Sequence, residues 1–436
     1  MLMSYFLVSS LTMFNYAIET CMMLSVMSML YLLTNWPFTY SSTSWLLSMD
    51  FISYNMIILS LWIIVMSMLA SITEKWAHKN YFNLCNIVLM TFLFMSFSAK
   101  SYLLFYIFFE ASLIPILMII LGWGYQPERT LAGIYMLFYT LFASLPLLGL
   151  IFFLNTKMGT SDMMLKTLIY MNPWMYLTMV AAFLVKFPMY MVHIWLPKAH
   201  VEAPVSGSMI LAGVLLKLGG YGLMRFLPLL IKLNSEYIKY LLVSTSLMGG
   251  LFISMICLRQ MDMKMLIAYS SVCHMASCIS SLLILGELAM KGSLFMMVAH
   301  GLCSSGLFYL VDVVYKRTNT RTLLINKGLL NILPTLSFWW FMLLVANLAG
   351  PPSMNLMSEI CMITNLVAWN KMNSVMIMLI IFMTGAYSMF IYSMSQHNKY
   401  LFSLNSVKTP SFLNFFILLN HLIPLNIMIL SVWSFN

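Results

Sequence analysis

The chain has 436 residues, of which 62% are hydrophobic and only 8% charged, and this composition excludes an ordinary soluble domain. Its formal net charge of +10 comes from Lys and Arg residues scattered through the polar connections, which excludes a concentrated nucleic-acid-binding patch. The seven cysteines form no CxxC pair and most lie in apolar stretches, so we predict no disulfide, zinc site or iron–sulfur cluster.

Apolar stretches of about 17 to 25 residues recur along the chain and predict an all-α, multi-pass membrane protein. We expect about fourteen transmembrane helices and no removable targeting segment. In chain order, their predicted ranges are 2–18, 20–34, 50–72, 82–98, 101–121, 132–154, 176–196, 206–226, 238–258, 265–285, 292–314, 333–368, 373–394 and 412–432.

Two of these predicted helices should be interrupted. The twelfth is too long for a single span, and Gly350, Pro351 and Pro352 remove backbone hydrogen bonds in its middle. Pro188 is expected to have a similar effect in the seventh. Paired broken helices, one in each half of a chain, indicate a transporter fold built from inverted repeats.

The two halves of the chain also agree in spacing. Glu110 and His274 lie 164 residues apart, and Pro188 and Pro352 are separated by the same 164 residues. This agreement favours an internal repeat.

Charge in the connections predicts the orientation. An even number of spans places both termini on one side, and the positive-inside rule puts the more basic connections in the inner compartment, so that both termini face outward. Lys186 and Lys217 lie inside the membrane. The inner set has twelve basic residues, which are Lys75, Lys79, Arg129, Lys198, Arg259, Lys264, Lys316, Arg317, Arg321, Lys327, Lys399 and Lys408. The outer set has eight, which are Lys100, Lys157, Lys166, Arg225, Lys232, Lys239, Lys291 and Lys371.

Ionisable side chains at mid-membrane depth indicate the chemistry. Each costs about 2.5 to 3.5 kcal/mol on insertion scales and therefore needs a partner, water or a function. An acid and an amine close together titrate as a coupled pair, and neutral imidazoles relay protons through bound water. We therefore predict proton movement across the membrane. The candidate proton-transfer residues are Glu110, Lys186, Lys217, His274, His300 and Glu359.

Structural interpretations compete at several positions. Glu110 and Lys186 could form a purely structural ion pair, and buried histidines can simply hydrogen-bond between packed helices. Glu359 follows the helix break, where a carboxylate can cap the N-terminus of a half-helix. Two further polar groups near helix ends are expected to be interfacial caps (His193, His200 and Glu202) and a surface ion group (Asp312, Lys316 and Arg317).

Five segments carry the candidate residues and the second break. They are FYIFFEASLIP (105–115), LVKFPMYMVHIWLPKAHVEAPVSGSMILAGVLLKLGGYGLMR (184–225), LRQMDMKMLIAYSSVCHM (258–275), AHGLCSSGLFYL (299–310) and NLAGPPSMNLMSEI (347–360). In this order they closely resemble the subunit 4 family of NADH dehydrogenase, mitochondrial respiratory complex I. The resemblance runs from about residue 50 to the C-terminus.

This resemblance implies an antiporter-like fold of fourteen helices, with helices 7 and 12 broken. Two inverted five-helix repeats would occupy 82–226 and 238–394. N-terminal helices in 1–81 and a C-terminal helix in 395–436 would complete a single membrane domain. Glu359 would be the acid of the second broken helix.

The resemblance also implies roles for the other five residues. Glu110 and Lys186 would be the interacting acid and lysine, and Lys217 the connecting lysine. His274 and His300 would lie on the central hydrophilic axis of the membrane arm.

Further implications concern cofactors, partners and location. The chain would hold no redox centre, because NADH, FMN, the iron–sulfur clusters and ubiquinone bind elsewhere in the complex, whose quinone reduction would drive this subunit. Its neighbours would be the similar subunits 2 and 5, accessory subunits and lipids such as cardiolipin in the mitochondrial inner membrane. The 45 methionines fit a chain translated inside the organelle.

The leading functional prediction is a proton-pumping subunit of a redox enzyme. A stand-alone cation/proton antiporter shares the fold and the acid–lysine pair, and an inert scaffold of the membrane arm is a third alternative. For the pump, we expect a proton to enter from the inner side, load Lys217 or the histidines, and leave outward near Glu359.

Overall fold

The structure is a computed structural model and divides into two compact units, each built almost wholly of helices. Unit 1 comprises Met1–Phe187 and Glu202–Glu236, and unit 2 comprises Pro188–Val201 and Tyr237–Asn436. The residues that the structure describes are 17–33, 42–43, 46–74, 76, 78–163, 172–230, 236–399 and 408–431.

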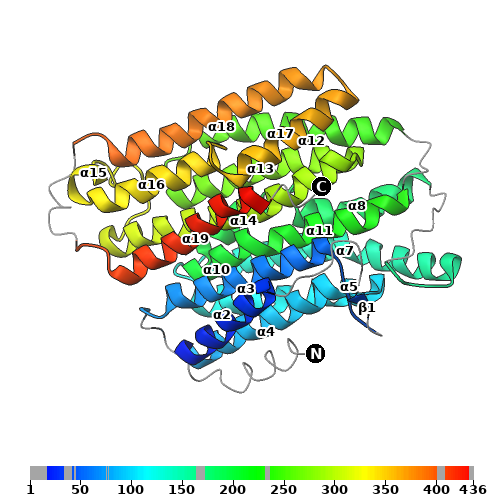
Figure 1. The fold of residues 1–436 in the computed structure, drawn as a ribbon, viewed down its shortest axis with the longest axis horizontal. Helices are drawn as coiled ribbons and strands as arrows, with labels where there is room; N and C mark the ends of the chain where they lie inside the picture. The colour runs from blue at the N-terminus through cyan, green and yellow to red at the C-terminus, as the bar shows by residue number, and fades with distance from the viewer. Residues whose placement is uncertain are drawn as a thin grey trace. The chain divides into compact units, whose positions relative to one another are not determined.

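Unit 1 contains the helices drawn from blue to green in Figure 1 and a two-stranded antiparallel sheet in which Ser42 pairs with Met49. Its elements are α2 (Ala17–Leu33), β1 (Ser42–Thr43), β2 (Ser48–Met49), α3 (Phe51–Ser71), α4 (Lys79–Ser98), α5 (Tyr102–Ala111), α6 (Leu113–Trp123), α7 (Arg129–Met158), α8 (Pro173–Lys186), α10 (Val205–Ile210), the π-helix η1 (Leu211–Leu215), α11 (Leu216–Phe226) and the 3-10 helix η2 (Leu227–Leu230).

Close packing of α8 against α11 fixes the position of two lysines in unit 1. A side chain at Gly222 would collide with the Phe183 ring, and a Cβ at Gly219 would lie 2.7 Å from the backbone nitrogen of Phe187. Small residues of this kind let transmembrane helices approach closely. The contact places Lys186, the last residue of α8, beside the helix that carries Lys217.

Unit 2 contains the helices drawn from green to red in Figure 1. They are α9 (Trp195–Glu202, whose last residue belongs to unit 1), α12 (Glu236–Cys257, whose first residue belongs to unit 1), α13 (Met263–Ile284), α14 (Glu287–Thr318), α15 (Leu329–Ile332), α16 (Pro334–Asn347), α17 (Met354–Trp369), α18 (Asn373–Gln396) and α19 (Phe412–Ser431).

Helix α14 is the core of unit 2. It packs against α13, α16, α17 and α19, and its most apolar 18-residue stretch is wholly buried. A helix surrounded on all sides has no solvent-facing side for polar residues. The polar side chains of α14 are therefore satisfied inside the protein, either within the helix, as Ser304 is by the carbonyl of His300, or by its neighbours.

The predicted break in the twelfth helix is confirmed. Helix α16 ends at Asn347 and α17 begins at Met354, with the Gly350–Pro352 segment between them. The Asn355 side chain donates a hydrogen bond of 2.6 Å to the carbonyl of Ala346, which bridges the break. The same carbonyl also accepts from the backbone nitrogen of Ala349 at 3.2 Å, so it is satisfied at the break, as a membrane interior requires.

The seventh predicted helix is also interrupted, as Pro188 indicates. Helix α8 ends at Lys186, and α9 begins only at Trp195. Met191, between them, has a left-handed backbone with φ of 76°.

Ten helices among the described residues are long and apolar enough to cross a membrane, and Ala17–Leu32 and Pro173–Lys186 are shorter apolar helices. The predicted first span (2–18) lies almost entirely outside the described residues. The count of fourteen and the two inverted repeats stay predictions.

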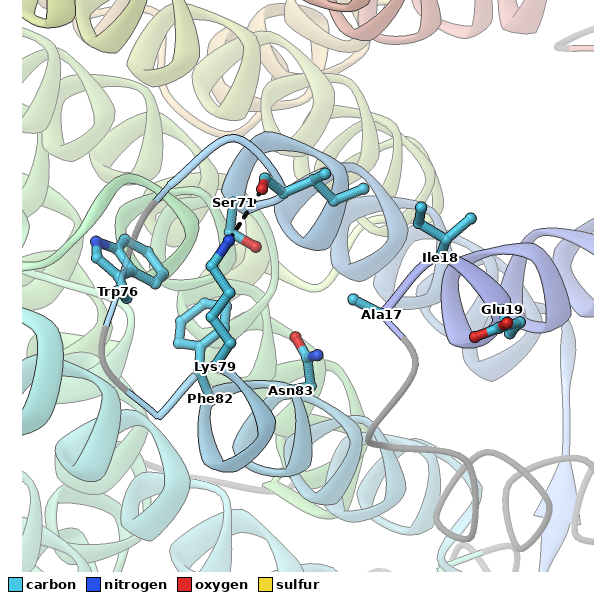
Figure 2. A pocket seen from close by; sticks show the side chains of 9 residues that line it. Ala17, Ile18, Glu19, Ser71, Trp76, Lys79, Phe82 and Asn83 are labelled. Atoms are coloured by element: carbon cyan, nitrogen blue, oxygen red, sulfur yellow. Dashed lines mark hydrogen bonds between the residues drawn. The ribbon is translucent and has the colours of Figure 1, made fainter.

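Aromatic and basic residues gather where α3 ends and α4 begins in unit 1. The Lys79 side chain donates to the Ile72 carbonyl at 3.2 Å, beside a cavity of about 360 Å³ that Trp76 and Phe82 help to line (Figure 2). Phe82 packs edge-on against Trp123 at the end of α6, with ring centroids 5.4 Å apart. Tryptophan and basic residues are typical of a membrane interface, and this composition favours a place for this end of the unit at a membrane surface.

Candidate functional site

Glu110 and Lys186 come together in unit 1 but do not form a direct ion pair. The Lys186 ammonium donates to the carbonyl of Phe109 at 2.6 Å and lies 3.2 Å from the centre of the Phe109 ring. The lysine is only 2% exposed. Its charge is thus held by a backbone dipole and an aromatic face, one residue from the acid.

The Glu110 carboxylate is buried and is only weakly bound by its surroundings. Both of its oxygens are buried and accept no hydrogen bond of normal geometry from the described residues. Its electrostatic neighbours include Lys186, Tyr106 and Ser144 of α7. A carboxylate held this loosely can move toward the lysine or toward water without first breaking a strong bond.

The carbonyl of Phe109 precedes Glu110 in the chain and lies close to the break between α5 and α6. It accepts hydrogen bonds from Lys186 and, at 2.8 Å, from the Ser112 hydroxyl at the junction of α5 and α6. Sequence reasoning missed both Ser112 and Ser144, because a serine within an apolar helix gives no signal of its own.

Lys217 is fully buried at the start of α11, directly after the π-helix η1. Its ammonium donates to the carbonyl of Ala212, within that π-helix. Next to Ala212, Gly213 faces Ile63 of α3, whose side chain leaves no room for a Cβ. π-Helical turns inside α-helices occur often at functional sites. The sequence did not predict this one.

Unit 2 brings His274, His300 and Glu359 together. The His274 Nδ1 lies 3.7 Å from a carboxylate oxygen of Glu359, and its ring centroid is 5.6 Å from that of His300. Both histidines are buried, and the Glu359 side chain is 16% exposed. The three residues come from α13, α14 and α17, which pack against one another.

Tyr387 of α18 is a fourth member of this cluster that sequence reasoning missed. Its hydroxyl lies 3.3 Å from the Nε2 of His274, and it is fully buried. A hydroxyl donating to Nε2 would leave the proton on Nδ1, which faces Glu359. Tyrosine is common in apolar helices, so the sequence around Tyr387 gives no signal. Only its contact with His274, 113 residues away in the chain, distinguishes it from other tyrosines.

One sequence interpretation of polar residues here was wrong. Asp312 is completely buried and pairs with Lys316 at 2.7 Å, so this is not a surface ion group. Arg225, assigned to the outer side, is the next-to-last residue of α11 and forms an ion pair of 2.6 Å with Asp50. Lys264, assigned to the inner side, is 1% exposed in the first turn of α13.

The residues around α9 also differ from expectation. His200 is fully buried and stacks face to face on Phe308, with ring centroids 4.7 Å apart. It therefore packs within unit 2 and is not an interfacial cap. His193 is 8% exposed and lies beside Tyr190 and Tyr269.

No metal centre emerges from the part of the chain that the structure describes. There, no three His, Cys, Asp or Glu side chains are grouped so that they could hold a metal ion. All seven cysteines are free thiols, and five of them are buried.

Broken helices and buried acid, lysine and histidine groups in a helical membrane bundle define an antiporter-like membrane subunit. Residues 99–384 match the family described as NADH:quinone oxidoreductase/Mrp antiporter, TM, and residues 1–96 match the amino terminus of NADH-ubiquinone oxidoreductase chain 4. The chain is 46% identical over 413 residues to NADH-ubiquinone oxidoreductase chain 4 of Ceratitis capitata, which covers 94% of this chain and 92% of that one. It therefore belongs to the NADH-ubiquinone oxidoreductase chain 4 family.

Solved structures share the fold at low sequence identity. A chain of respiratory complex I from Thermus thermophilus matches with a TM-score of 0.88 and 21% identity, covering 99% of this chain and 96% of that chain. A chain of the Mrp complex from Dietzia matches with a TM-score of 0.84 and 18% identity, covering 99% and 51%. These two structural matches establish only that the chain has the antiporter-like fold.

Proposed function

We propose that the chain is a proton-translocating subunit in the membrane arm of NADH:ubiquinone oxidoreductase, complex I. The observation that carries the proposal is the arrangement of Glu110 and Lys186, an acid and an amine buried side by side without a closed ion pair. Keeping two ionisable groups in an apolar interior costs several kcal/mol (roughly 2.5 to 3.5 for each on insertion scales), and a structural pair would close to offset it.

The Lys186 ammonium is the movable charge in this proposal. While the ammonium donates to the Phe109 carbonyl, it keeps its proton. Its proton affinity changes when it moves toward Glu110, or when it moves away from both Glu110 and the Phe109 carbonyl. Moving one charge against the membrane potential costs about 2.3 kcal/mol per 100 mV. Rearranging a charge pair in a low-dielectric interior supplies energies of that size.

His274 and Glu359 form the second proton-transfer step. Their 3.7 Å separation is slightly too long for a direct hydrogen bond, so a small rotation or one water completes the connection. His300, in ring contact with His274, supplies a further imidazole. We assign the six predicted residues the role of carrying protons, with the inner side as entrance.

We infer the rest of the assembly from family membership. Electron transfer from NADH to ubiquinone, through FMN and iron–sulfur clusters, takes place in other subunits and drives this one. In this proposal the antiporter-like subunits 2 and 5 flank it in the mitochondrial inner membrane, and membrane lipids such as cardiolipin are further partners.

Lys186→Met tests the proposal in the assembled enzyme. Proton pumping should fall at least about tenfold, because the movable charge and its interaction of a few kcal/mol are lost. The measurement is the proton-to-electron ratio in proteoliposomes. Lys157→Met is the matched control, since Lys157 also lies near a phenylalanine ring but is exposed at the end of α7. Unchanged pumping in Lys186→Met at normal assembly would leave the chain as an inert scaffold.

A stand-alone cation/proton antiporter is the alternative function. The likeness to the Mrp complex favours it only at the level of the fold. The full-length chain reconstituted alone in liposomes should therefore exchange no sodium or potassium for protons. Exchange that is lost in Lys186→Met would favour the antiporter instead.

A further inference from the structure

A cavity of about 360 Å³ lies in unit 1 where α2 begins, α3 ends and α4 begins (Figure 2). Small-molecule sites in proteins usually measure about 300–1,000 Å³, so the cavity can hold a small ligand or one part of a larger ligand. Trp76 and Lys79 in its wall favour a place at a membrane surface, where lipid headgroups lie. None of the six proton-transfer residues lines it.

The wall of the cavity contains one acid and one base. Glu19 is in the first turn of α2, and Lys79 is the first residue of α4. Figure 2 shows Lys79 on the same side of the cavity as Trp76, and Glu19 on the other side. Within the described part of the chain, no ion pair joins the two. Opposite charges that face one cavity without touching are complementary to a ligand that carries both charges.

The two side chains offer different hydrogen-bonding groups. The Lys79 ammonium donates one hydrogen to the Ile72 carbonyl at 3.2 Å, so two of its three donors remain for a ligand. Phosphate oxygens are strong acceptors for such donors. Glu19 is exposed and, when ionised, only accepts hydrogen bonds. The cavity therefore suits a phosphate on one side and a cation with N–H bonds on the other.

An exposed apolar stripe runs from the cavity along α2. Ile18 lines the cavity, and Met22, Val26 and Leu30 follow at intervals of four residues, each 47–64% exposed. The stripe measures roughly 18 Å, which slightly exceeds the hydrocarbon thickness of one leaflet, about 15 Å. Leu24, outside the stripe, is buried, and α2 packs on α3. An acyl chain can therefore lie on the stripe while its headgroup occupies the cavity.

We propose that this cavity and stripe bind a phospholipid with an ethanolamine headgroup. Its phosphate pairs with Lys79, its ammonium donates to Glu19, and one acyl chain follows α2. A choline headgroup has a cation without N–H donors, and a headgroup that is only anionic leaves Glu19 facing a like charge. The site names a lipid partner of unit 1 and does not depend on the proton-translocating function.

The test uses the assembled enzyme in vesicles of equal parts phosphatidylethanolamine, phosphatidylcholine and phosphatidylglycerol. One lipid at a time carries a photoreactive acyl chain, and cross-links are mapped by peptide mass spectrometry. We expect phosphatidylethanolamine to label Met22 and Val26 about three- to tenfold more than the other two lipids, the effect of about one hydrogen bond. The exposed residues Phe138 and Phe142 of α7 do not line the cavity, so their labelling should show no preference.

Two substitutions separate the charges. In Glu19→Gln the preference for phosphatidylethanolamine over phosphatidylglycerol should disappear or reverse, because Lys79 alone favours a net negative headgroup. In Lys79→Gln the labelling of α2 by all three lipids should fall, because each contains a phosphate. A purely structural role of either residue would not change the selectivity. Glu128→Gln is the matched control, since Glu128 is an exposed acid of the same unit that does not line the cavity.

Equal labelling of α2 by the three lipids in the native enzyme would overturn the site. A native preference that survives Glu19→Gln, or that is lost equally in Glu128→Gln, would do the same. Soluble phosphoethanolamine should not displace the lipid, because it lacks the acyl chain; full displacement would contradict a lipid ligand. The labelling needs no turnover, so its failure would leave the proton-translocating function standing.

Discussion

The two compact units hold their ionisable groups in different ways. In unit 1, Lys186 and Lys217 are bound to backbone carbonyls, so a positive charge is kept in place by the ends of peptide dipoles. In unit 2, His274 contacts Glu359 and Tyr387 through side chains, each of which can give or take a proton. The first arrangement suits storing a charge, and the second suits passing it along.

This difference follows from the residue types. An ammonium in an apolar interior needs acceptors around it, and carbonyls freed near a helix end or a π-helix provide them without a second charge. An imidazole has a donor and an acceptor, so it needs one partner of each kind. Helix irregularities therefore accompany the lysines of unit 1.

Of the substitutions that test this difference between the units, Gly222→Ala is expected to have the largest effect, because it disturbs the packing that positions Lys186 in unit 1. The new methyl group would collide with the ring of Phe183, which cannot turn away because it is packed among Phe105, Phe109 and Phe226. Overpacking of this kind costs about 1–3 kcal/mol. The amount of assembled complex and its pumping should both fall.

Gly149→Ala is the control for this substitution. Gly149 lies on α7 in the same unit, and nothing lies within 4 Å of a Cβ placed there. Its variant should assemble and pump normally. Normal pumping by Gly222→Ala as well would mean that the α8–α11 contact does not position Lys186.

A smaller effect is expected from Tyr387→Phe in unit 2. The change removes the hydroxyl that faces the Nε2 of His274, so the imidazole can adopt either tautomer. About a two- to tenfold loss of pumping turnover follows, which corresponds to one hydrogen bond. Tyr392→Phe, which alters a partly exposed ring on the same helix, should have no effect. Equal losses in both variants would contradict a specific role for Tyr387.

The amino-acid sequence predicts the membrane class and the helix breaks well, because each depends on local properties. Apolar length identifies a span, proline removes a backbone hydrogen bond, and Glu110 stands out within an apolar segment. Sequence reasoning fails where the partner is distant along the chain. Asp50 and Arg225 are 175 residues apart, and nothing in either neighbourhood indicates the other.

Residues near predicted helix ends are the second source of error. A charged residue there can extend to the membrane surface or turn inward, and only the packing of neighbouring helices decides between these outcomes. Asp312 and Lys264 are buried for this reason. The orientation stays a prediction, and its charge bias is unchanged when Lys264 and Arg225, which were counted on opposite sides, are both left out.

The central claim is that Glu110 and Lys186 act together as a coupled pair in moving protons. The most direct measurement is a double-mutant cycle on the proton-to-electron ratio, with Glu110→Gln, Lys186→Met and both together in the assembled enzyme. Residues that act as a unit are strongly non-additive, so the double variant should pump no worse than either single variant. Losses that multiply in the double variant would contradict the claim, because each residue would then contribute independently.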